Sequence, residues 1–368
     1  MSDPSISTNL RQSLGLMSGT SLDGIDVAQI ATDGGNRVIA GPALTVPYAE
    51  EFRERLRSVL GGIGDVPAVE AELTRLHAAA VGEFRARYPA AQFDLIGLHG
   101  HTILHRPQER RTWQIGDGAL LARLTQCDVV ADFRSADVAA GGEGAPLAPL
   151  YHAALAADLP KPLAVLNLGG VGNVTWIGRR SNDIFAFDTG PGNALIDDWV
   201  KRHTGRAADF DGALARSGRA SEAHVARFMQ APYFDRKPPK SLDRDDFCDF
   251  VPEDLYVADG AATLTEMTAA AVAAATRHFP APARRWLVCG GGRHNPAIMS
   301  ALSRRLDRSV RPVEAVGWNG DALEAQAFAY LAVRSVLDLP LSLPSTTGAP
   351  HPVRGGRLFP AAAQSPVT

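Results

Sequence analysis

Two segments of the chain share one plan: an apolar strand, a loop of small residues, and a second apolar strand. The first is "GLMSGTSLDGIDVAQI", which starts at Gly15, and the second is "VLNLGGVGNVTWIG", which starts about 150 residues later at Val165. A hairpin turn usually needs only two to five residues, whereas residues 18–24 hold two glycines, several hydroxyls and a carboxylate. Two such hairpins, one near the start of each half of the chain, predict two related lobes.

Strands alternate with helices in the rest of the chain. The spacing of apolar residues predicts helices over residues 49–62, 66–88 and 262–279 and a strand, glycine turn and helix over residues 284–306. Alternation of this kind predicts an α/β fold, and the hairpins make its sheets mixed rather than purely parallel.

The lobe boundaries follow from the same pattern. We expect a first lobe over residues 1–147, with residues 1–13 as an unstructured lead-in, and a second lobe over residues 148–339. Residues 340–368 are rich in proline, glycine and serine, and we expect them to pack back on the first lobe as an extended segment.

Composition excludes several classes of function. The 368 residues carry a net charge of −3 and show no basic run, so nucleic acid is not an expected partner. No apolar run has the length of a membrane span, and the N-terminus lacks an apolar signal core. The three cysteines, Cys127, Cys248 and Cys289, are far apart and odd in number, which fits a reducing compartment. We therefore expect a soluble cytoplasmic protein that binds neither nucleic acid nor membrane.

The glycine loops predict a phosphate site. Glycines let the backbone approach an anion, and successive N–H groups form a positively polarised nest. The hydroxyls of Ser18, Thr20 and Ser21 add donors, and the Asp23 carboxylate fits beside a polyphosphate if a hydrated Mg²⁺ lies between them. A third loop, "CGGGRHNP" from Cys289, lacks the spacing of a dinucleotide fingerprint, and the chain has no P-loop lysine motif. We expect ATP in a cleft between the lobes, and the alternative is that these loops are ordinary turns.

The segment "FAFDTGPGN" places a carboxylate, Asp188, at the end of an apolar strand. Partial burial shifts the pKa of a carboxyl group upward, toward the range of a general base. The alternative is that Asp188 caps the helix that begins near Ala194, but Asn193 is better placed for that role.

The segment "LHGHTILHRP" contains His99, His101 and His105, and strand alternation predicts that all three lie on one face. Contacts with a polar substrate are the main interpretation. A metal site and buried core histidines are the alternatives.

Four charged residues surround a glycine pair in "ADFRSADVAAGGEGAPL", namely Asp132, Arg134, Asp137 and Glu143. Arg134 suits a substrate carboxylate. It suits equally well a structural ion pair with Asp132 or Asp137.

Together, "GLMSGTSLDGIDVA", "ADFRSADVAAGGEGAPL", "NLGGVGNVT", "FDTGPGNALID" and "VCGGGRHNPAIM" resemble the anhydro-N-acetylmuramic acid kinase family, over residues 14–339. That family lies in the actin, Hsp70 and sugar-kinase ATPase superfamily. The resemblance implies a two-lobed actin-like (ribonuclease H-like) fold, with a mixed five-stranded sheet and flanking helices in each lobe and the active site in the cleft between them.

The resemblance also implies a double reaction. Water adds to C1 of 1,6-anhydro-N-acetylmuramic acid, the anhydro bridge opens, and the freed O6 takes the γ-phosphoryl group of ATP with Mg²⁺. The product is N-acetylmuramic acid 6-phosphate, in the recycling of cell-wall peptidoglycan. Family members are usually homodimers, so a homodimer is expected.

The site residues that the resemblance implies fall into three groups. Asp188 is the base that activates the water. His99, Arg134, Glu143 and Glu324 lie near the sugar, with Glu324 in "DALEAQAFAYLA". The nucleotide residues are Gly19, Thr20, Ser21, Leu22, Asp23, Gly24, Ile25, Asp26, Gly169, Gly170, Asn173, Gly290, Gly291, Gly292 and Asn295, with Asp23 acting on Mg²⁺ through water.

The chain departs from the family pattern at three places. His101 stands where glutamine is expected, Val171–Gly172 where a bulkier and more polar step is expected, and "GWNGDALEAQ" differs around Glu324. Three alternatives stay open: a related kinase that acts on a simple hydroxyl, an ATP-driven conformational module without a sugar substrate, and a metal-dependent hydrolase that uses the histidines.

Overall fold

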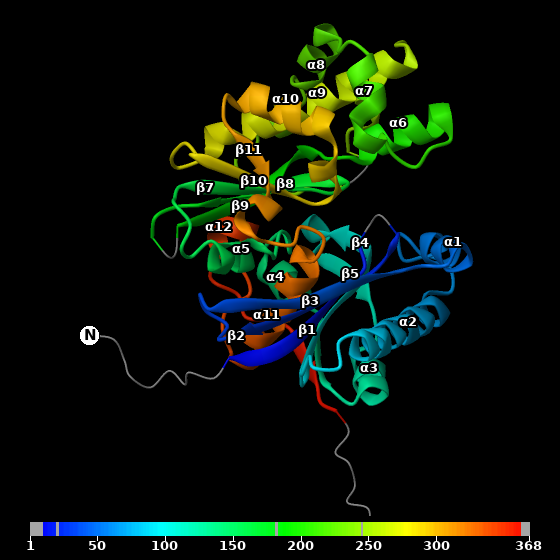
Figure 1. Cartoon of the computed structure of the whole chain (residues 1–368), viewed down its shortest axis with the longest axis vertical. Helices are drawn as coiled ribbons and strands as arrows, with labels where there is room; N and C mark the ends of the chain where they lie inside the picture. The colour runs from blue at the N-terminus through cyan, green and yellow to red at the C-terminus, as the bar shows by residue number, and fades with distance from the viewer. Residues whose placement is uncertain (1–9, 20–21, 181–182, 244–245, 362–368) are drawn as a thin grey trace, which may run out of the picture. The chain divides into compact units, whose positions relative to one another are not determined.

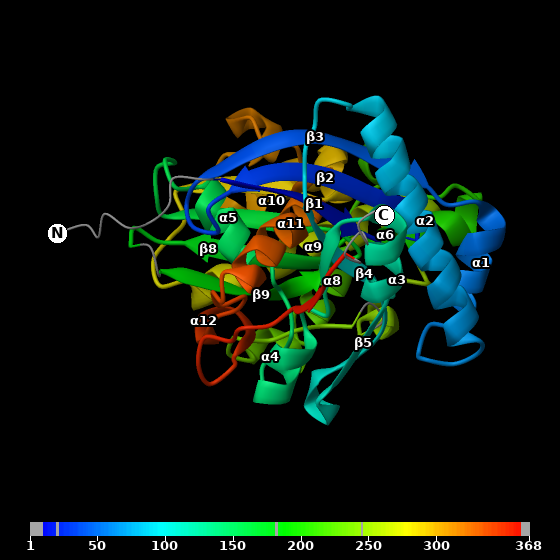
Figure 2. The same ribbon diagram turned by 90° about the horizontal axis from the view of Figure 1, so that it is seen from below.

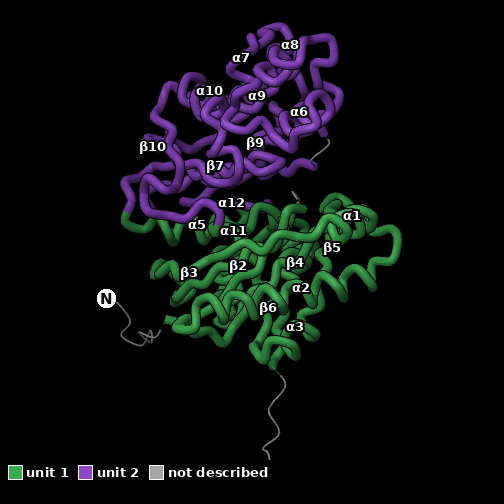
Figure 3. The backbone as a smooth tube through the Cα atoms, turned by 45° about the vertical axis from the view of Figure 1, so that its right-hand side comes forward, with its two compact units in different colours: residues 1–158, 322–344, 349–368 green, residues 159–321, 345–348 purple. Residues whose placement is uncertain are grey.

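The computed structural model describes residues 10–19, 22–180, 183–243 and 246–361. Its contacts divide the chain into two compact units, coloured separately in Figure 3. The first unit contains residues 1–158, 322–344 and 349–368, and the second contains residues 159–321 and 345–348. This division differs from the expected boundaries, because helix α11 (Leu323–Val336) packs on strands of the first unit rather than on the second.

The first unit is built on a sheet with seven strands among the described residues, in the order β12-β6-β4-β1-β2-β3, with β5 paired to β4. Figure 1 shows β1, β2 and β3 in blue, and Figure 2 shows the same three strands side by side. The strands are β1 (Arg11–Met17), β2 (Gly24–Thr32), β3 (Val38–Pro47), β4 (Leu95–Arg106), β5 (Arg111–Ile115), β6 (Asp128–Ala131) and β12 (Arg357–Phe359).

The second unit has a five-stranded sheet among the described residues, in the order β11-β10-β7-β8-β9. Its strands are β7 (Leu163–Leu168), β8 (Val171–Ile177), β9 (Ile184–Pro191), β10 (Arg285–Cys289) and β11 (Val310–Pro312).

Both sheets follow one succession. Three consecutive antiparallel strands (β1-β2-β3 and β7-β8-β9) are followed by two strands that lie parallel to the first (β4 and β6, then β10 and β11). The α/β class with mixed sheets is therefore confirmed. The expected five strands are exceeded in the first unit, where β5 and β12 are added to the common plan.

The helices of the first unit cover both faces of its sheet. Gly15 faces α11, since a Cβ atom there would lie 1.7 Å from the Ala325 carbonyl oxygen. The neighbours Leu14 and Leu16 point the other way, into a core that includes Leu73 and Phe84 of α2. The helices are α1 (Glu50–Ser58), α2 (Val66–Arg87), α3 (Gly118–Thr125), α4 (Ser135–Ala140), α5 (Pro149–Leu155) and α11, with a short 3-10 helix at Pro107–Glu109.

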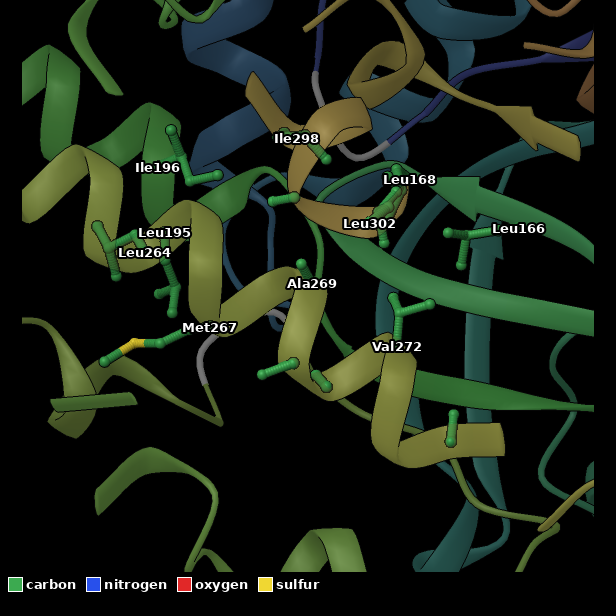
Figure 4. Close-up of a cluster of buried hydrophobic side chains, with 14 of the residues drawn as sticks. Leu166, Leu168, Leu195, Ile196, Leu264, Met267, Ala269, Val272, Ile298 and Leu302 are labelled. Carbon is green, nitrogen blue, oxygen red and sulfur yellow. The ribbon is translucent and has the colours of Figure 1, made fainter. Parts of the chain in front are cut away.

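The second unit buries one face of its sheet under helices α6, α9 and α10. Leu166 and Leu168 of β7 pack against this layer, together with the labelled side chains of Figure 4, among them Met267 and Leu302. The helices are α6 (Ala194–Thr204), α7 (Ala213–Ser217), α8 (Glu222–Phe228), α9 (Val257–Ala275) and α10 (Pro296–Leu306), while α12 (Pro344–Thr347) begins on the last residue of a first-unit segment. Short 3-10 helices lie at Phe210–Gly212, Pro232–Asp235, Cys248–Phe250, Thr276–His278, Gly291–His294 and Val313–Val316.

Two features of the first sheet were not expected from the sequence. Strand β1 begins at Arg11, inside the expected lead-in, and buries Ser13, whose hydroxyl donates to the Leu95 carbonyl. Strand β3 was missed because Pro42 interrupts its apolar pattern. Proline is tolerated there because β3 is an edge strand.

In the described part of the chain, no helix is both long and apolar enough to cross a membrane.

Candidate active site

Two hydroxyl groups and a histidine ring form a chain of hydrogen bonds that anchors the loop after β1. The Tyr48 hydroxyl donates to Ser18 Oγ (2.7 Å), and Ser18 Oγ lies 3.0 Å from Nδ1 of His101. Because the serine hydroxyl is already an acceptor from Tyr48, its own proton is available to Nδ1. Ser18 is therefore a buried support of the loop (1% exposed) rather than a surface donor.

His101 is neutral in this chain of hydrogen bonds. Burial lowers its pKa to about 4. Since Nδ1 accepts from Ser18, the ring proton lies on Nε2, a buried atom with no hydrogen-bond partner among the described residues. His101, which stands where glutamine is expected, thus still supplies an acceptor for the Ser18 hydroxyl.

The predicted nucleotide run, residues 19–26, is only partly described. Thr20 and Ser21 lie outside the described residues. The side chains of Leu22 and Ile25 are buried in the core of the first unit, so only their backbone can serve a ligand. Asp23 is exposed, and its carbonyl accepts from Tyr48 N–H (3.0 Å).

The last residues of this run belong to the sheet. Gly24 is required by packing, since a Cβ atom would lie 2.4 Å from the Val46 carbonyl oxygen. Asp26 accepts from the Thr45 hydroxyl (2.6 Å). Gly19 lies at the start of the loop, and its carbonyl accepts from Leu22 N–H (3.1 Å).

His99 and Arg134 are brought together, 35 positions apart in the sequence. His99 Nδ1 donates to the Gly100 carbonyl (2.9 Å), while Nε2 accepts from Arg134 Nε (3.2 Å) and Nη2 (3.0 Å). Burial and, second, the Arg134 guanidinium lower the pKa of His99 well below its usual range. His99 is therefore a neutral residue that orients Arg134.

The glycine-rich loop after α4 also contacts Arg134. Arg134 Nη1 donates to the Gly144 carbonyl (2.7 Å), and Gly144 N–H donates to Asp137 Oδ1 (2.7 Å). Asp137 is buried and also accepts from the Ser342 hydroxyl. Glu143 is half-buried between Gly142 and Gly144, so it lies on the same loop as the carbonyl that Arg134 contacts.

Glu324 lies in the first turn of α11 and is exposed. One helical turn later, Phe328 stacks on His99 with ring centroids 4.4 Å apart. Since residues four apart share a helix face, Glu324 belongs to the neighbourhood of His99 and Arg134. Of the residues expected near the sugar, His99, Arg134 and the loop of Glu143 are thus brought together, and Glu324 lies one helical turn before the residue that stacks on His99.

The metal alternative for the histidines finds no support. Both ring nitrogens of His99 are engaged, and His105 Nδ1 lies 3.0 Å from Thr112 Oγ1. The expected alternation along the strand is interrupted at Gly100, whose φ is +72°. Within the described ranges, no group of three or more histidine, cysteine or acidic side chains has a metal-binding arrangement.

In the second unit, two glycine loops meet. Gly192 N–H and Ala194 N–H donate to the Gly170 carbonyl (2.9 and 3.2 Å), and Asn193 N–H donates to the Gly169 carbonyl (2.7 Å). A Cβ atom at Gly292 would lie 2.6 Å from Leu168 Cβ and 2.9 Å from Asn193 Oδ1. The loops after β7 and β10 therefore pack together, as a shared site requires.

Asn193 does not cap α6 with its side chain, which corrects the expected role. It occupies the position before the helix, but its Nδ2 donates to the Leu168 carbonyl (3.0 Å). Its Oδ1 is buried without a hydrogen-bond partner among the described residues.

Gly169 and Gly291 are glycines that the fold itself does not need. A Cβ atom at Gly169 would meet only the Val171 carbonyl oxygen, at 3.8 Å, and at Gly291 only Asn193 Nδ2, at 3.5 Å. Gly290 differs, because its φ of +73° and the Asn167 oxygen 2.4 Å from a Cβ atom there both require glycine. An open approach to the backbone at Gly169 and Gly291 is what a phosphate-bearing ligand uses.

Both polar atoms of the Asn295 side chain are hydrogen-bonded within the protein. Its Oδ1 accepts from Ala297 N–H (3.0 Å) and Ile298 N–H (3.2 Å) at the start of α10, and its Nδ2 donates to the Asp209 carbonyl (3.3 Å). Between Gly292 and Asn295, Arg293 is buried and ion-paired to Glu314 (2.9 Å) and Asp321 (2.8 Å).

Asp188 lies in β9 opposite Asn173 of β8, and it is 8% exposed. Leu242 N–H donates to its Oδ2 (2.9 Å), and Asp188 N–H donates to the Lys240 carbonyl (3.0 Å). The Tyr233 hydroxyl donates to the Asp188 carbonyl. The carboxylate is therefore held in one orientation by a backbone donor.

The sequence reasoning missed three residues around these sites: Tyr48, Tyr233 and Lys240. Each is far from its partner in sequence and lies outside any glycine motif. A weak sequence signal is Lys240 in "RKPPKSLD", which directly follows a proline pair.

The chain matches one family of known proteins. The family described as anhydro-N-acetylmuramic acid kinase matches residues 11–361. A relative with that name from Paramagnetospirillum magneticum is 60% identical over 349 residues, which cover 94% of this chain and 98% of the relative. One from Rhodospirillum rubrum is 56% identical, over 95% of this chain and 94% of the relative.

Among solved structures, the activator of the 2-hydroxyisocaproyl-CoA dehydratase from Clostridium difficile with bound ADPNP aligns at a TM-score of 0.46 and 10% identity, over 89% of this chain and 96% of that one. The match over residues 11–361 and the identity of the relatives together lead to one conclusion. The chain belongs to the anhydro-N-acetylmuramic acid kinase family.

Proposed function

We propose that this protein opens 1,6-anhydro-N-acetylmuramic acid with water and transfers the γ-phosphoryl group of ATP to O6, which gives N-acetylmuramic acid 6-phosphate for peptidoglycan recycling. The observation that carries the proposal is the buried, oriented carboxylate of Asp188, in a chain that matches the family over residues 11–361.

In this reaction Asp188 is the general base. It takes a proton from water as the water oxygen bonds to C1, and the bond from C1 to the bridging oxygen breaks. The released O6 gains charge and bonds to the γ-phosphorus, while ADP leaves. The hydrogen bond from Leu242 N–H fixes the orientation of the Asp188 carboxylate, which suits a base that acts on one water.

The nucleotide residues are Gly19 to Asp26 of the first unit and Gly169, Gly170, Asn173, Gly290, Gly291, Gly292 and Asn295 of the second. The open backbone at Gly169 and Gly291 supports this assignment. Asn295 acts through the helix cap that it forms, since its side-chain oxygen is engaged. The exposed Asp23 carboxylate fits a hydrated Mg²⁺, which would supply positive charge against the phosphates.

The sugar residues are His99, Arg134, Glu143 and Glu324. Arg134 pairs with the lactyl carboxylate of the sugar, and the neutral His99 ring holds the guanidinium plane in place. A simple hydroxyl kinase of the same superfamily is the second candidate, because Asp188 would serve a sugar hydroxyl as well as water.

We also propose a homodimer in the cytoplasm. The cysteines support a reducing compartment, since no disulfide joins any two of Cys127, Cys248 and Cys289, all of which are described residues. Light scattering on purified protein tests the dimer, and a single-chain mass would refute it.

The deciding experiment measures ATP consumption with Mg²⁺ and either 1,6-anhydro-N-acetylmuramic acid, N-acetylmuramic acid or no sugar. Stimulation by the anhydro sugar alone is the expected result, because only that sugar has a bridge to open. Equal stimulation by N-acetylmuramic acid would favour the simple hydroxyl kinase. No stimulation by either sugar would refute the anhydro sugar as the substrate and would leave a kinase that acts on another small molecule.

A further inference from the structure

Lys240 is a buried lysine that the proposed reaction does not use. It is 3% exposed, although lysine is almost never fully buried unless it is paired. It lies in residues 236–243, which follow the 3-10 helix Pro232–Asp235 and belong to no helix or strand, and it is hydrogen-bonded to strand β9. Because burial of a charged ammonium group costs free energy, contacts within the protein must stabilise Lys240.

The ammonium group of Lys240 contacts two aromatic residues, of which Tyr233 is the nearer. Nζ donates to the Tyr233 carbonyl (3.0 Å) and lies 4.2 Å from the centroid of the Tyr233 ring. The Phe187 ring centroid is 5.8 Å away. A cation over an aromatic face is attracted by the ring quadrupole, most strongly where water is excluded. Lys240 therefore ties its segment to Tyr233 and to β9.

Tyr233 and the segment that contains Lys240 are also both hydrogen-bonded to Asp188. The Lys240 carbonyl accepts Asp188 N–H (3.0 Å), and two residues later Leu242 N–H donates to Asp188 Oδ2 (2.9 Å). The hydroxyl of Tyr233 donates to the Asp188 carbonyl. The backbone donor, the backbone acceptor and one carboxylate oxygen of Asp188 are thus all fixed by Tyr233 and residues 240–242.

We propose that Lys240 is a positioning residue for Asp188: its ammonium group anchors residues 240–242 to Tyr233, and these residues hold the carboxylate in its catalytic orientation. The inference rests on the proposed role of Asp188 as the base. A carboxylate that loses its Leu242 donor turns away from the water, and a misplacement of 1 Å can cost on the order of 100-fold in rate.

The test compares Lys240→Met, Lys240→Arg and Lys237→Met. Methionine keeps the length and removes the charge without burying an unpaired ion. Lys237 is exposed three residues away, so Lys237→Met removes the same charge without these contacts. We expect Lys240→Met to lower kcat by roughly 10- to 100-fold with the KM for ATP changed less than about twofold. Arginine should restore part of kcat, and Lys237→Met should match wild type.

A second measurement separates positioning from a general loss of structure. In the Asp188→Asn background, Lys240→Met should lower the residual turnover less than about twofold, because the two residues act through one group. Equal losses in both backgrounds, or a wild-type kcat for Lys240→Met, would overturn the proposal.

Failure of the proposed function gives a different pattern. In that case wild type shows no sugar-dependent turnover at all. Hydrogen exchange of peptides that cover β9 and residues 238–243 then still decides the anchoring step, since it needs no substrate. Faster exchange in Lys240→Met than in Lys237→Met supports the anchor, and equal exchange refutes it.

Discussion

Arg134 donates from both Nε and Nη2 to a single atom, Nε2 of His99, at 3.2 and 3.0 Å. Arginine stays protonated in proteins, so the histidine must accept, and its own proton goes to the Gly100 carbonyl through Nδ1. The pair is a cation held by a neutral ring. The neutral ring orients the guanidinium plane without adding a charge of its own.

Arg134→Lys tests this arrangement. Lysine keeps the charge but cannot present the planar pair of donors to His99. We expect the KM for the anhydro sugar to rise by about tenfold or more, since a hydrogen bond to a charged group contributes about 1.5–3 kcal/mol. The KM for ATP should not change. Arg123→Lys, on the exposed side of α3, is the control. An unchanged sugar KM would reduce Arg134 to a support of the His99 ring.

Asp188→Asn removes the base and keeps the shape. The amide can still accept from Leu242 N–H, so the fold should be preserved. We expect kcat to fall by about 10²- to 10⁴-fold, the usual contribution of a general base, with ADP affinity unchanged by calorimetry. The exposed Asp243→Asn should behave as wild type. Normal turnover in Asp188→Asn would exclude Asp188 from the mechanism.

Asp23→Ala should act on the metal requirement. Its carboxylate is exposed at the loop after β1, where a hydrated Mg²⁺ would be shared with the phosphates. We expect a higher Mg²⁺ concentration for half-maximal rate, with the sugar KM unchanged. Asp158→Ala removes an exposed carboxylate elsewhere and should leave the Mg²⁺ titration alone. An identical titration for both variants means that Asp23 has no part in metal binding.

Two substitutions at His101 test whether its hydrogen bond with Ser18, rather than the imidazole ring itself, is needed for ATP binding. Glutamine supplies an oxygen that can accept from Ser18, whereas leucine leaves the buried serine hydroxyl without its acceptor. We expect His101→Gln to keep the KM for ATP and His101→Leu to raise it, because the loop at Gly19 loses its anchor. An unfilled buried hydrogen bond costs about 1–3 kcal/mol, so His101→Leu should also unfold at lower temperature. Equal ATP kinetics in both variants would remove the hydroxyl chain from nucleotide binding.

Buried histidines predict acid sensitivity. Burial lowers the pKa of His77, His101 and His152 to about 4, against a usual value of 6.5. Between these values the unfolded chain binds protons that the folded chain does not. The free energy of unfolding therefore falls as the pH drops from 6.5 toward 4, by about 1.4 kcal/mol per pH unit for each histidine, and these groups add no pH dependence above about pH 7.5.

Urea unfolding at pH 7.5, 6.0 and 5.0 measures this slope. His77→Gln should flatten it by about one proton. His351→Gln, at an exposed position, should leave the slope unchanged. If His77→Gln has the wild-type slope, then His77 titrates normally in the folded protein.

Local patterns were enough to predict much of this molecule. The hairpin strands, the helices α1, α2 and α10, and the α/β class follow from spacing and from glycine, and the family motifs are confirmed by the match over residues 11–361. Strand β3 was missed because Pro42 is unfavourable in a strand unless the strand lies at an edge, and edge position is a property of the whole sheet.

The sequence by itself determined which residue types were available: the glycine loops, Asp188, and the residues His99, Arg134, Glu143 and Glu324. The tertiary structure alone decided how they are held. It assigned α11 to the first unit, gave His99 its tautomer through Arg134, turned Ser18 inward to His101, and brought Lys240 and Tyr233 to Asp188. The physical reason is that spacing encodes only contacts within one element, whereas orientation, burial and pKa depend on neighbours that folding brings from tens of residues away.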